Sequence, residues 1–178
     1  MLAFIYVLFA LFMRIPSVPH LWGFTPVTAA LLYFGARGSR RLMWIPLGLL
    51  IAADVILDKF FYAYPLSWDL LLTWAWYAAM LWLGTALREN SKIWRIAGAA
   101  LTGSLSFFVI SNFGVWAATA MYPKTLAGLM TCYIAGLPFF RHTVEGDLFF
   151  SAVLFGLPVA YVAITRALSK THDTTAAA

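Results

Sequence analysis

Charged side chains are scarce in this sequence. Only 11% of its 178 residues are Asp, Glu, Lys or Arg, whereas a soluble domain of this size carries about a quarter. Hydrophobic residues make up 63% and aromatic residues 17%. So few charges cannot cover the surface of a soluble globule, and so apolar a chain does not stay disordered. The composition therefore predicts an all-α integral membrane protein, because helices are the favoured way to cross lipid.

The chain also lacks the residue patterns of several kinds of chemistry. Its single cysteine cannot form an internal disulfide. It contains no Walker-type phosphate loop, no His-x-x-x-His and no Cys-x-x-Cys. The three histidines, His20, His142 and His172, fall in predicted loops or in the tail, so no general base lies beside an intramembrane nucleophile. We therefore expect no enzymatic activity, and the sequence indicates no cofactor or metal.

Six apolar runs are candidates for crossing a ~30 Å hydrocarbon core, which takes roughly 20 residues. They cover residues 1–13, 24–36, 42–57, 68–87, 93–121 and 148–168. No basic residue precedes the first run and no small-x-small cleavage site follows it, so we interpret it as a retained span. The sequence thus predicts a six-transmembrane-helix bundle over residues 1–168, followed by a polar, disordered tail over residues 169–178.

The basic residues test this topology independently of hydropathy. Six crossings place eight of the twelve basic residues on the side of the two termini and four on the other side. The positive-inside rule makes the side of the eight cytoplasmic, so both termini are expected there. The eight are Arg37, Arg40, Arg41, Arg88, Lys92, Arg95, Arg166 and Lys170. The net charge of +5 is then explained by loops that face anionic lipid, and we expect no nucleic-acid partner.

Polar residues within the apolar runs mark candidate functional positions. Asp54 lies in the third run, four residues before Asp58, so both carboxylates project from one helical face. Ionisable groups at membrane depth usually face a cavity or a partner. Asp54 is therefore either a pocket residue or a structural residue, and in the second case it contacts water near the membrane surface or pairs with an arginine. Asn112, near the end of the fifth run, suits either a ligand or an interhelical hydrogen bond.

The segment after the fifth run is too apolar for a plain connector. Residues 125–140 are too few to cross the bilayer. A seventh span would also no longer leave eight of the twelve basic residues on one side of the membrane. We therefore expect a half-inserted or interfacial helix. This segment could form a lid over an outward-facing pocket. Glu145 and Asp147 then open the sixth run, where acidic residues favour the helix dipole.

Several motifs together resemble a known family. They are Asn112-Phe113-Gly114-Val115-Trp116, Met121 to Leu129, Cys132-Tyr133, Leu137-Pro138-Phe139-Phe140-Arg141, Gly146-Asp147, Leu154-Phe155-Gly156 and, more weakly, Phe24-Thr25-Pro26-Val27 and Asp54. Over residues 14–156 the chain resembles an uncharacterised bacterial family described as transport proteins. That family looks related to the S-components, the substrate-binding subunits of energy-coupling-factor (ECF) vitamin transporters.

The resemblance implies a six-helix fold in the bacterial inner membrane, with both termini cytoplasmic and a pocket near the outer face. It also implies two kinds of partner, a transmembrane coupling subunit and a pair of cytosolic ATPases. Typical S-components carry Ala-x-x-x-Ala in the first helix for docking. Here Ala3 and Ala10 are seven apart, and the matching pair, Ala75 and Ala79, lies in the fourth run. A solitary transporter therefore stays open as an alternative.

Our leading hypothesis is a membrane subunit that captures a small, vitamin-like micronutrient from outside. Its expected pocket or lid residues are Asp54, Asn112, Trp116, Tyr122, Lys124 and Arg141. Lys124 and Arg141 would engage a carboxylate or phosphate, Asp54 or Asn112 would orient a polar ring edge, and Trp116 would stack. Cys132 is either a small buried residue or a soft ligand for the metal of a cobalamin-type substrate.

The alternative function is a structural or assembly subunit of a larger membrane complex. Small-residue faces, such as Gly98 to Gly103 and Ala75 to Ala79, would then bind partner helices. Such a subunit would hold Asp54 and Arg141 in a salt bridge with no cavity above them. An intramembrane enzyme ranks last, because the sequence offers no paired acid and base.

Overall fold

The computed structural model of the chain describes residues 1–15 and 23–176, and every regular element in these ranges is helical. The elements are α1 (Leu2–Phe12), α2 (Val27–Arg37), the 3-10 turn η1 (Arg40–Leu42), α3 (Trp44–Ile56), the π-helical turn η2 (Leu57–Tyr62), α4 (Leu70–Thr85), α5 (Ile93–Ala118) and α6 (Leu126–Ala176). The predicted all-α class is confirmed, with six α-helices in chain order.

Local sequence explains several helix boundaries. Pro26 precedes the first residue of α2, where a missing backbone N–H costs little. The π-helical turn η2 continues α3 and ends at Tyr62; the next residue, Ala63, has a left-handed backbone at φ 53°. This bulge between Leu57 and Tyr62 rotates the side chains that follow it relative to the face of α3.

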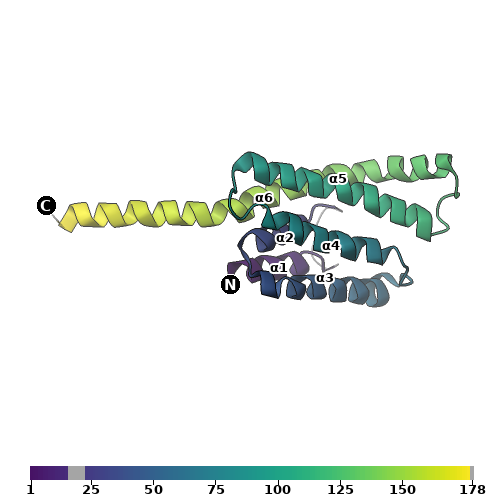
Figure 1. Cartoon of the computed structure of the whole chain (residues 1–178), viewed down its shortest axis with the longest axis horizontal. Coiled ribbons are helices and arrows are strands. Elements are labelled where there is room, and N and C mark those ends of the chain that lie inside the picture. The colour runs from purple at the N-terminus through teal and green to yellow at the C-terminus, as the bar shows by residue number, and fades with distance from the viewer. Residues whose placement is uncertain (16–22, 177–178) are drawn as a thin grey trace.

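Helix α2 is the centre of the bundle (Figure 1). All its residues from Val27 to Ala36 are buried. It packs most closely on α4, because Gly35 and Gly84 face one another so tightly that a Cβ on either would overlap backbone atoms of the other helix. Small residues at such a crossing let two helix backbones approach directly, so this contact fixes the relative position of α2 and α4.

The two basic connections lie side by side at one end of the bundle. Arg88, after α4, donates from Nε to the carbonyl oxygen of Gly35 (2.8 Å) and from Nη2 to that of Gly38 (2.7 Å). Arg37 Nη2 donates to Ser91 Oγ at 3.0 Å. Arginines at helix carboxyl ends satisfy the last carbonyls and favour the helix dipole. Helix α1 begins and α6 ends toward this same side of the molecule (Figure 1).

Helix α6 corrects one expectation. Residues 126–140 are not a separate half-inserted helix but the first part of one helix of 51 residues, with Pro138 and Pro158 inside it. The physical reason is packing against α5, which sustains the helix through Pro138. Tyr133 donates its hydroxyl to the carbonyl oxygen of Val109 at 2.8 Å, and the rings of Phe108 and Phe140 lie 4.7 Å apart.

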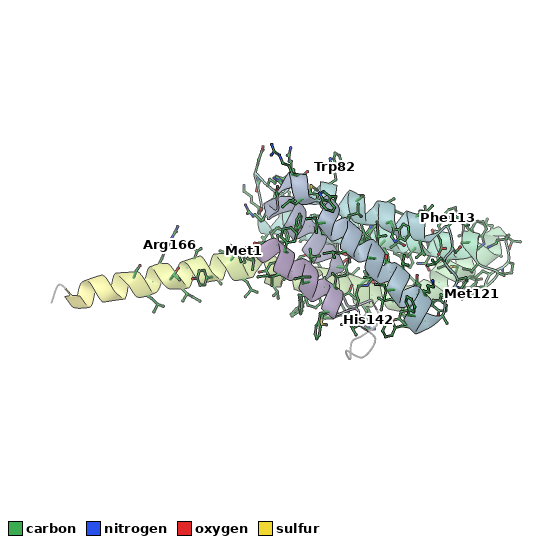
Figure 2. The ribbon with its side chains drawn as sticks, turned by 90° about the horizontal axis from the view of Figure 1, so that it is seen from below. Met1, Trp82, Phe113, Met121, His142 and Arg166 are labelled. Atoms are coloured by element: carbon green, nitrogen blue, oxygen red, sulfur yellow. The ribbon has the colours of Figure 1, made fainter. Side chains whose placement is uncertain are left out.

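The carboxyl-terminal part of α6 projects beyond the bundle. Figure 2 shows Arg166 on this projecting part and Met121 at the opposite end of the molecule. The helix continues to Ala176, so it includes much of the stretch for which the sequence predicts a disordered tail; residues 177 and 178 lie outside the described residues. Its large apolar side chains there are exposed, namely Leu157, Val159, Tyr161, Val162, Ile164 and Leu168.

Helix length separates the six helices into two groups. Within the described residues, α5 and the part of α6 from Leu126 to Ser169 are long and apolar enough to cross a membrane. Helices α1 and α2 have 11 residues each, which is about 17 Å at 1.5 Å per residue. Large exposed apolar side chains occur all along the exterior, including Leu8, Trp82 and Leu105. Such a surface is unusual for a soluble monomer.

Candidate functional site

A cavity of about 320 Å³ lies where α2 begins and α3 ends, away from the basic connections. Aromatic walls come from Tyr62 of η2, Trp76 and Tyr77 of α4, and Phe107 of α5. Polar side chains also line the cavity, namely those of Arg14, Thr25, Thr28, Asp58, Thr143 and Asp147. An apolar hollow with a few placed polar groups is the usual form of a small-molecule site, and 320 Å³ is at the lower end of the usual size range.

Arg14 and Asp54 form the polar framework behind one wall of this cavity. Arg14 Nη2 pairs with Asp54 Oδ1, and the side chains are 21% and 5% exposed. Trp74 donates from Nε1 to Asp54 Oδ2 at 3.0 Å. The hydroxyl of Tyr77 accepts from Arg14 Nη1 and donates to Asp54 Oδ1, both at 3.2 Å. Asp54 is thus neutralised by one arginine and holds Arg14 and Tyr77 at the cavity wall.

Asp147 is the most deeply buried charged residue of the site. Its side chain, on α6, is 1% exposed. Ser104 of α5 donates its hydroxyl to Asp147 Oδ2 at 2.6 Å, and the side chain of Thr28 of α2 is a second hydrogen-bond partner. No ion pair among the described residues includes Asp147. Its partners are therefore hydroxyls, which relieve part of the cost of burying a carboxylate but carry no counter-charge.

Asp58 places a second carboxylate on the cavity wall, next to Arg14. Burial raises the pKa of Asp58, and the negative charge of Asp54 raises it further. The positive charge of Arg14 acts in the opposite direction, while Asp69 adds a weaker raising effect. Asp69 itself precedes α4, and its Oδ1 is buried with no hydrogen-bond partner among the described residues. Asp58 thus lies near two other carboxylates, those of Asp54 and Asp69, and near the guanidinium of Arg14.

None of the six residues expected at the pocket lines this cavity. Asp54 lies behind its wall, as described. Asn112 lies between α5 and α6, where its amide donates to the carbonyl oxygen of Phe108 at 2.8 Å and its oxygen packs against Gly136. Cys132 is 2% exposed and donates from Sγ to the carbonyl oxygen of Asn112 at 3.3 Å. Asn112 thus makes an interhelical contact.

Trp116 and Lys124 come together at the far end of α5. Lys124 donates from Nζ to the carbonyl oxygens of Trp116 and Thr119, and lies 5.7 Å from the centre of the Trp116 ring. Trp116 donates from Nε1 to the carbonyl oxygen of Pro123 at 2.9 Å. Tyr122 is half-buried in the same connection. These contacts close the turn between α5 and α6, so the three residues lie apart from the Arg14–Asp54 pair.

Arg141 lies on the surface of α6, not in a loop. Its side chain is 79% exposed, and its Nε donates to Glu145 Oε1 at 2.9 Å, one turn along the helix. His142 is on the same helix, with Nδ1 3.3 Å from Glu145 Oε2; its expected place in a loop is wrong because α6 is continuous. His20 lies outside the described residues. The described part of the chain contains no cluster of three His, Cys, Asp or Glu that could hold a metal.

Most polar residues that line the cavity are not among those that the sequence singles out; Asp58, which it singles out with Asp54, is the exception. The sequence indicates Arg14 as the end of the first apolar run and Asp147 as the start of the sixth. In the structure Asp147 lies well inside α6, so its interpretation as a helix-start residue is wrong. The available indication was an unpaired acidic residue immediately before an apolar run, together with Ser104 and Thr28 in other runs. Which of these residues meet depends on how the helices are packed.

Comparison with known proteins assigns a family. The model of DUF6580, described as a family of unknown function, matches residues 1–169. No curated protein and no solved structure matches the chain at a significant level. Since the family model covers nearly the whole sequence, the chain belongs to the DUF6580 family.

Proposed function

We propose that this protein is a membrane-embedded, non-catalytic subunit that binds a small, vitamin-like micronutrient for uptake, similar to an ECF S-component. The observation that carries the proposal is the cavity of about 320 Å³, which combines aromatic walls with Arg14, Asp58 and Asp147. Buried ionisable groups are costly in an apolar bundle and typically mark a substrate path. A purely structural helix bundle would gain stability from filling this space with side chains.

The membrane setting of the proposal rests on the exterior of the bundle. Apolar side chains cover the outside of the helices, and α5 and α6 are long enough to cross a bilayer. We propose six crossings in the bacterial inner membrane, with both termini cytoplasmic. The side-by-side basic connections around Arg37 and Arg88 support this orientation. The cavity then opens toward the outer face, beyond the start of α2.

The short α2 provides a physical reason for a cavity at this end. Helix α2 begins at Val27, and both Val27 and Thr28 line the cavity. A central helix of only 11 residues does not fill the core along the full length of its neighbours. The space beyond its start is closed by longer elements, among them α6 at Thr143 and Asp147.

The alternative of a structural subunit fits these contacts less well. That alternative calls for a salt bridge between Asp54 and Arg141 with no cavity above it. Asp54 pairs with Arg14 instead, and Arg141 pairs with Glu145. Partner proteins belong to the proposal all the same. We propose that a coupling subunit contacts the exposed apolar part of α6 around residues 157–168, with cytosolic ATPases supplying energy.

The test is mass spectrometry of small molecules released from the purified protein. The wild-type chain should release one compound in near-stoichiometric amount. Thr143→Phe, which fills the cavity, should release much less of it. Thr131→Phe is the matched control, since both threonines lie on α6 and donate to the carbonyl four residues earlier, but Thr131 is exposed and away from the cavity. Absence of any bound compound, or equal amounts from both variants, would refute the binding function.

Membrane orientation needs a separate test. Cysteines introduced at Arg41 and at Lys124, in a Cys132→Ser background, should react with an impermeant reagent from opposite faces of the membrane. Reaction of both positions from the same face would overturn the six-crossing topology.

A further inference from the structure

Acidic side chains outnumber basic ones among the described residues that line the cavity. Among the described residues, three charged side chains line it, those of Arg14, Asp58 and Asp147. The charge of Arg14 is matched by Asp54, with which it forms an ion pair. Among the described residues, neither Asp58 nor Asp147 takes part in an ion pair. Two carboxylates thus face a space of about 320 Å³ without a basic partner of their own.

The start of α2 offsets only part of the negative charge that these two side chains carry when they are ionised. The amino terminus of a helix carries about half a positive charge, and α2 begins at the cavity with Val27 and Thr28. That contribution is small against two carboxylates. Asp147 has the greater need of a counter-charge, because it is 1% exposed and its partners are the uncharged hydroxyls of Ser104 and Thr28. A buried carboxylate of this kind is stabilised most by a cation next to it.

The aromatic walls favour the same kind of ligand. Trp76 and Phe107 form adjoining walls, with ring centres 4.9 Å apart at an angle of 52°. The indole of Trp76 is held in place, since Nε1 donates to Ser106 Oγ at 2.9 Å. Aromatic faces attract cations through the ring quadrupole, most strongly where water is excluded. Carboxylates and aromatic faces around one apolar space are together the chemistry that recognises organic cations.

We propose that the cavity binds a small organic cation, an ammonium or a positively charged heteroaromatic ring, whose charge lies next to Asp147 and Asp58. This assignment rests on the proposed binding function and specifies its substrate class. It differs from the expectation that Lys124 and Arg141 engage a carboxylate or phosphate, because both of those residues lie outside the cavity.

The experiment compares three probes that share a phenyl ring and differ in charge, on the detergent-purified full chain. Benzyltrimethylammonium is a cation, benzyl alcohol is neutral and benzoate is an anion. Binding is measured by calorimetry and by the shift in thermal unfolding, because a ligand of the folded state raises Tm. The cation should bind and raise Tm, while benzyl alcohol and benzoate should bind at least about tenfold more weakly.

Two variants link the result to the cavity. Asp147→Asn keeps the shape of the side chain and removes its charge, and it should weaken binding of the cation by about tenfold or more. Glu145→Gln is the control, since it removes a carboxylate from the same helix that is 45% exposed and outside the cavity. If Asp147→Asn does not fold, Asp58→Asn, at the more accessible carboxylate, serves the same purpose.

The outcomes separate this inference from the proposed function. Preferred binding of benzoate, or unchanged cation binding by Asp147→Asn, overturns the assignment of a cation. If no probe binds, the charge of the co-purified compound decides, and a neutral or anionic compound refutes the cation while the binding function stands. If no probe binds and no compound co-purifies, both proposals fail.

Discussion

The ion pair of Arg14 and Asp54 allows the sharpest test of the structure. Replacing Arg14 by Met keeps a long apolar side chain but removes the guanidinium. Asp54, which is 5% exposed in the wild-type protein, then keeps only the neutral donors Trp74 and Tyr77. Leaving one partner of a buried pair without its counter-charge typically costs about 3–5 kcal/mol. In a chain of this length 1 kcal/mol corresponds to about 2–4 °C, so Tm should fall by about 6–20 °C.

The double variant determines whether the loss comes from the pair itself. Asp54→Asn removes the stranded charge while its side-chain oxygen can still accept from Trp74 or Tyr77. Arg14→Met combined with Asp54→Asn should therefore be more stable than Arg14→Met alone, and the two losses should not add. Thermal unfolding of the four detergent-purified proteins, followed by circular dichroism, measures the coupling. A fall of about 2 °C or less in Arg14→Met, or strictly additive losses, would refute the buried pair.

Three further predictions concern the packing, the charge and the connection of the helices. Gly84→Ala should lower the free energy of unfolding by about 1–3 kcal/mol because its Cβ would overlap the Leu32 carbonyl oxygen. The control Gly48→Ala, with open space around it, should be neutral or raise the free energy of unfolding by up to ~1 kcal/mol. Equal effects of the two substitutions would contradict the close contact of α2 and α4. The raised pKa of Asp58 means that the folded protein holds its proton more tightly than the unfolded chain, so stability is lost as pH rises through that pKa. Asp58→Asn should therefore raise Tm at pH 7, and this gain in Tm should shrink as the pH approaches the ordinary aspartate pKa of about 4. An equal gain in Tm at pH 7 and at pH 4 would contradict a raised pKa of Asp58. Lys124→Met should cost about 1 kcal/mol through the lost bonds to the carbonyl oxygens of Trp116 and Thr119, yet it should leave the amount of co-purified compound unchanged. A loss of that compound would show that Lys124 belongs to the binding site.

Some of the candidate site could be anticipated from the sequence. Asp54 is conspicuous as an ionisable residue within an apolar run, and it is indeed buried and paired. Pairing with an arginine was one of the alternatives that the sequence left open. The sequence does not identify that arginine, because Arg14 lies 40 residues away, in the segment after α1. For Asn112 the sequence leaves open a ligand contact or an interhelical hydrogen bond, and in the structure it lies between α5 and α6.

The sequence by itself determined the helical class and the order of the helices. Low charge and long apolar runs leave few other ways to satisfy the backbone, and Pro26 and the basic connections delimit several elements. Only the tertiary structure decided that residues 126–140 continue into α6 and that Asp147 meets Ser104 across a helix contact. Apolar periodicity does not give the rotation and the axial position of one helix against the next. Those two quantities, fixed here by contacts such as that of Gly35 with Gly84, decide which polar side chains face the cavity.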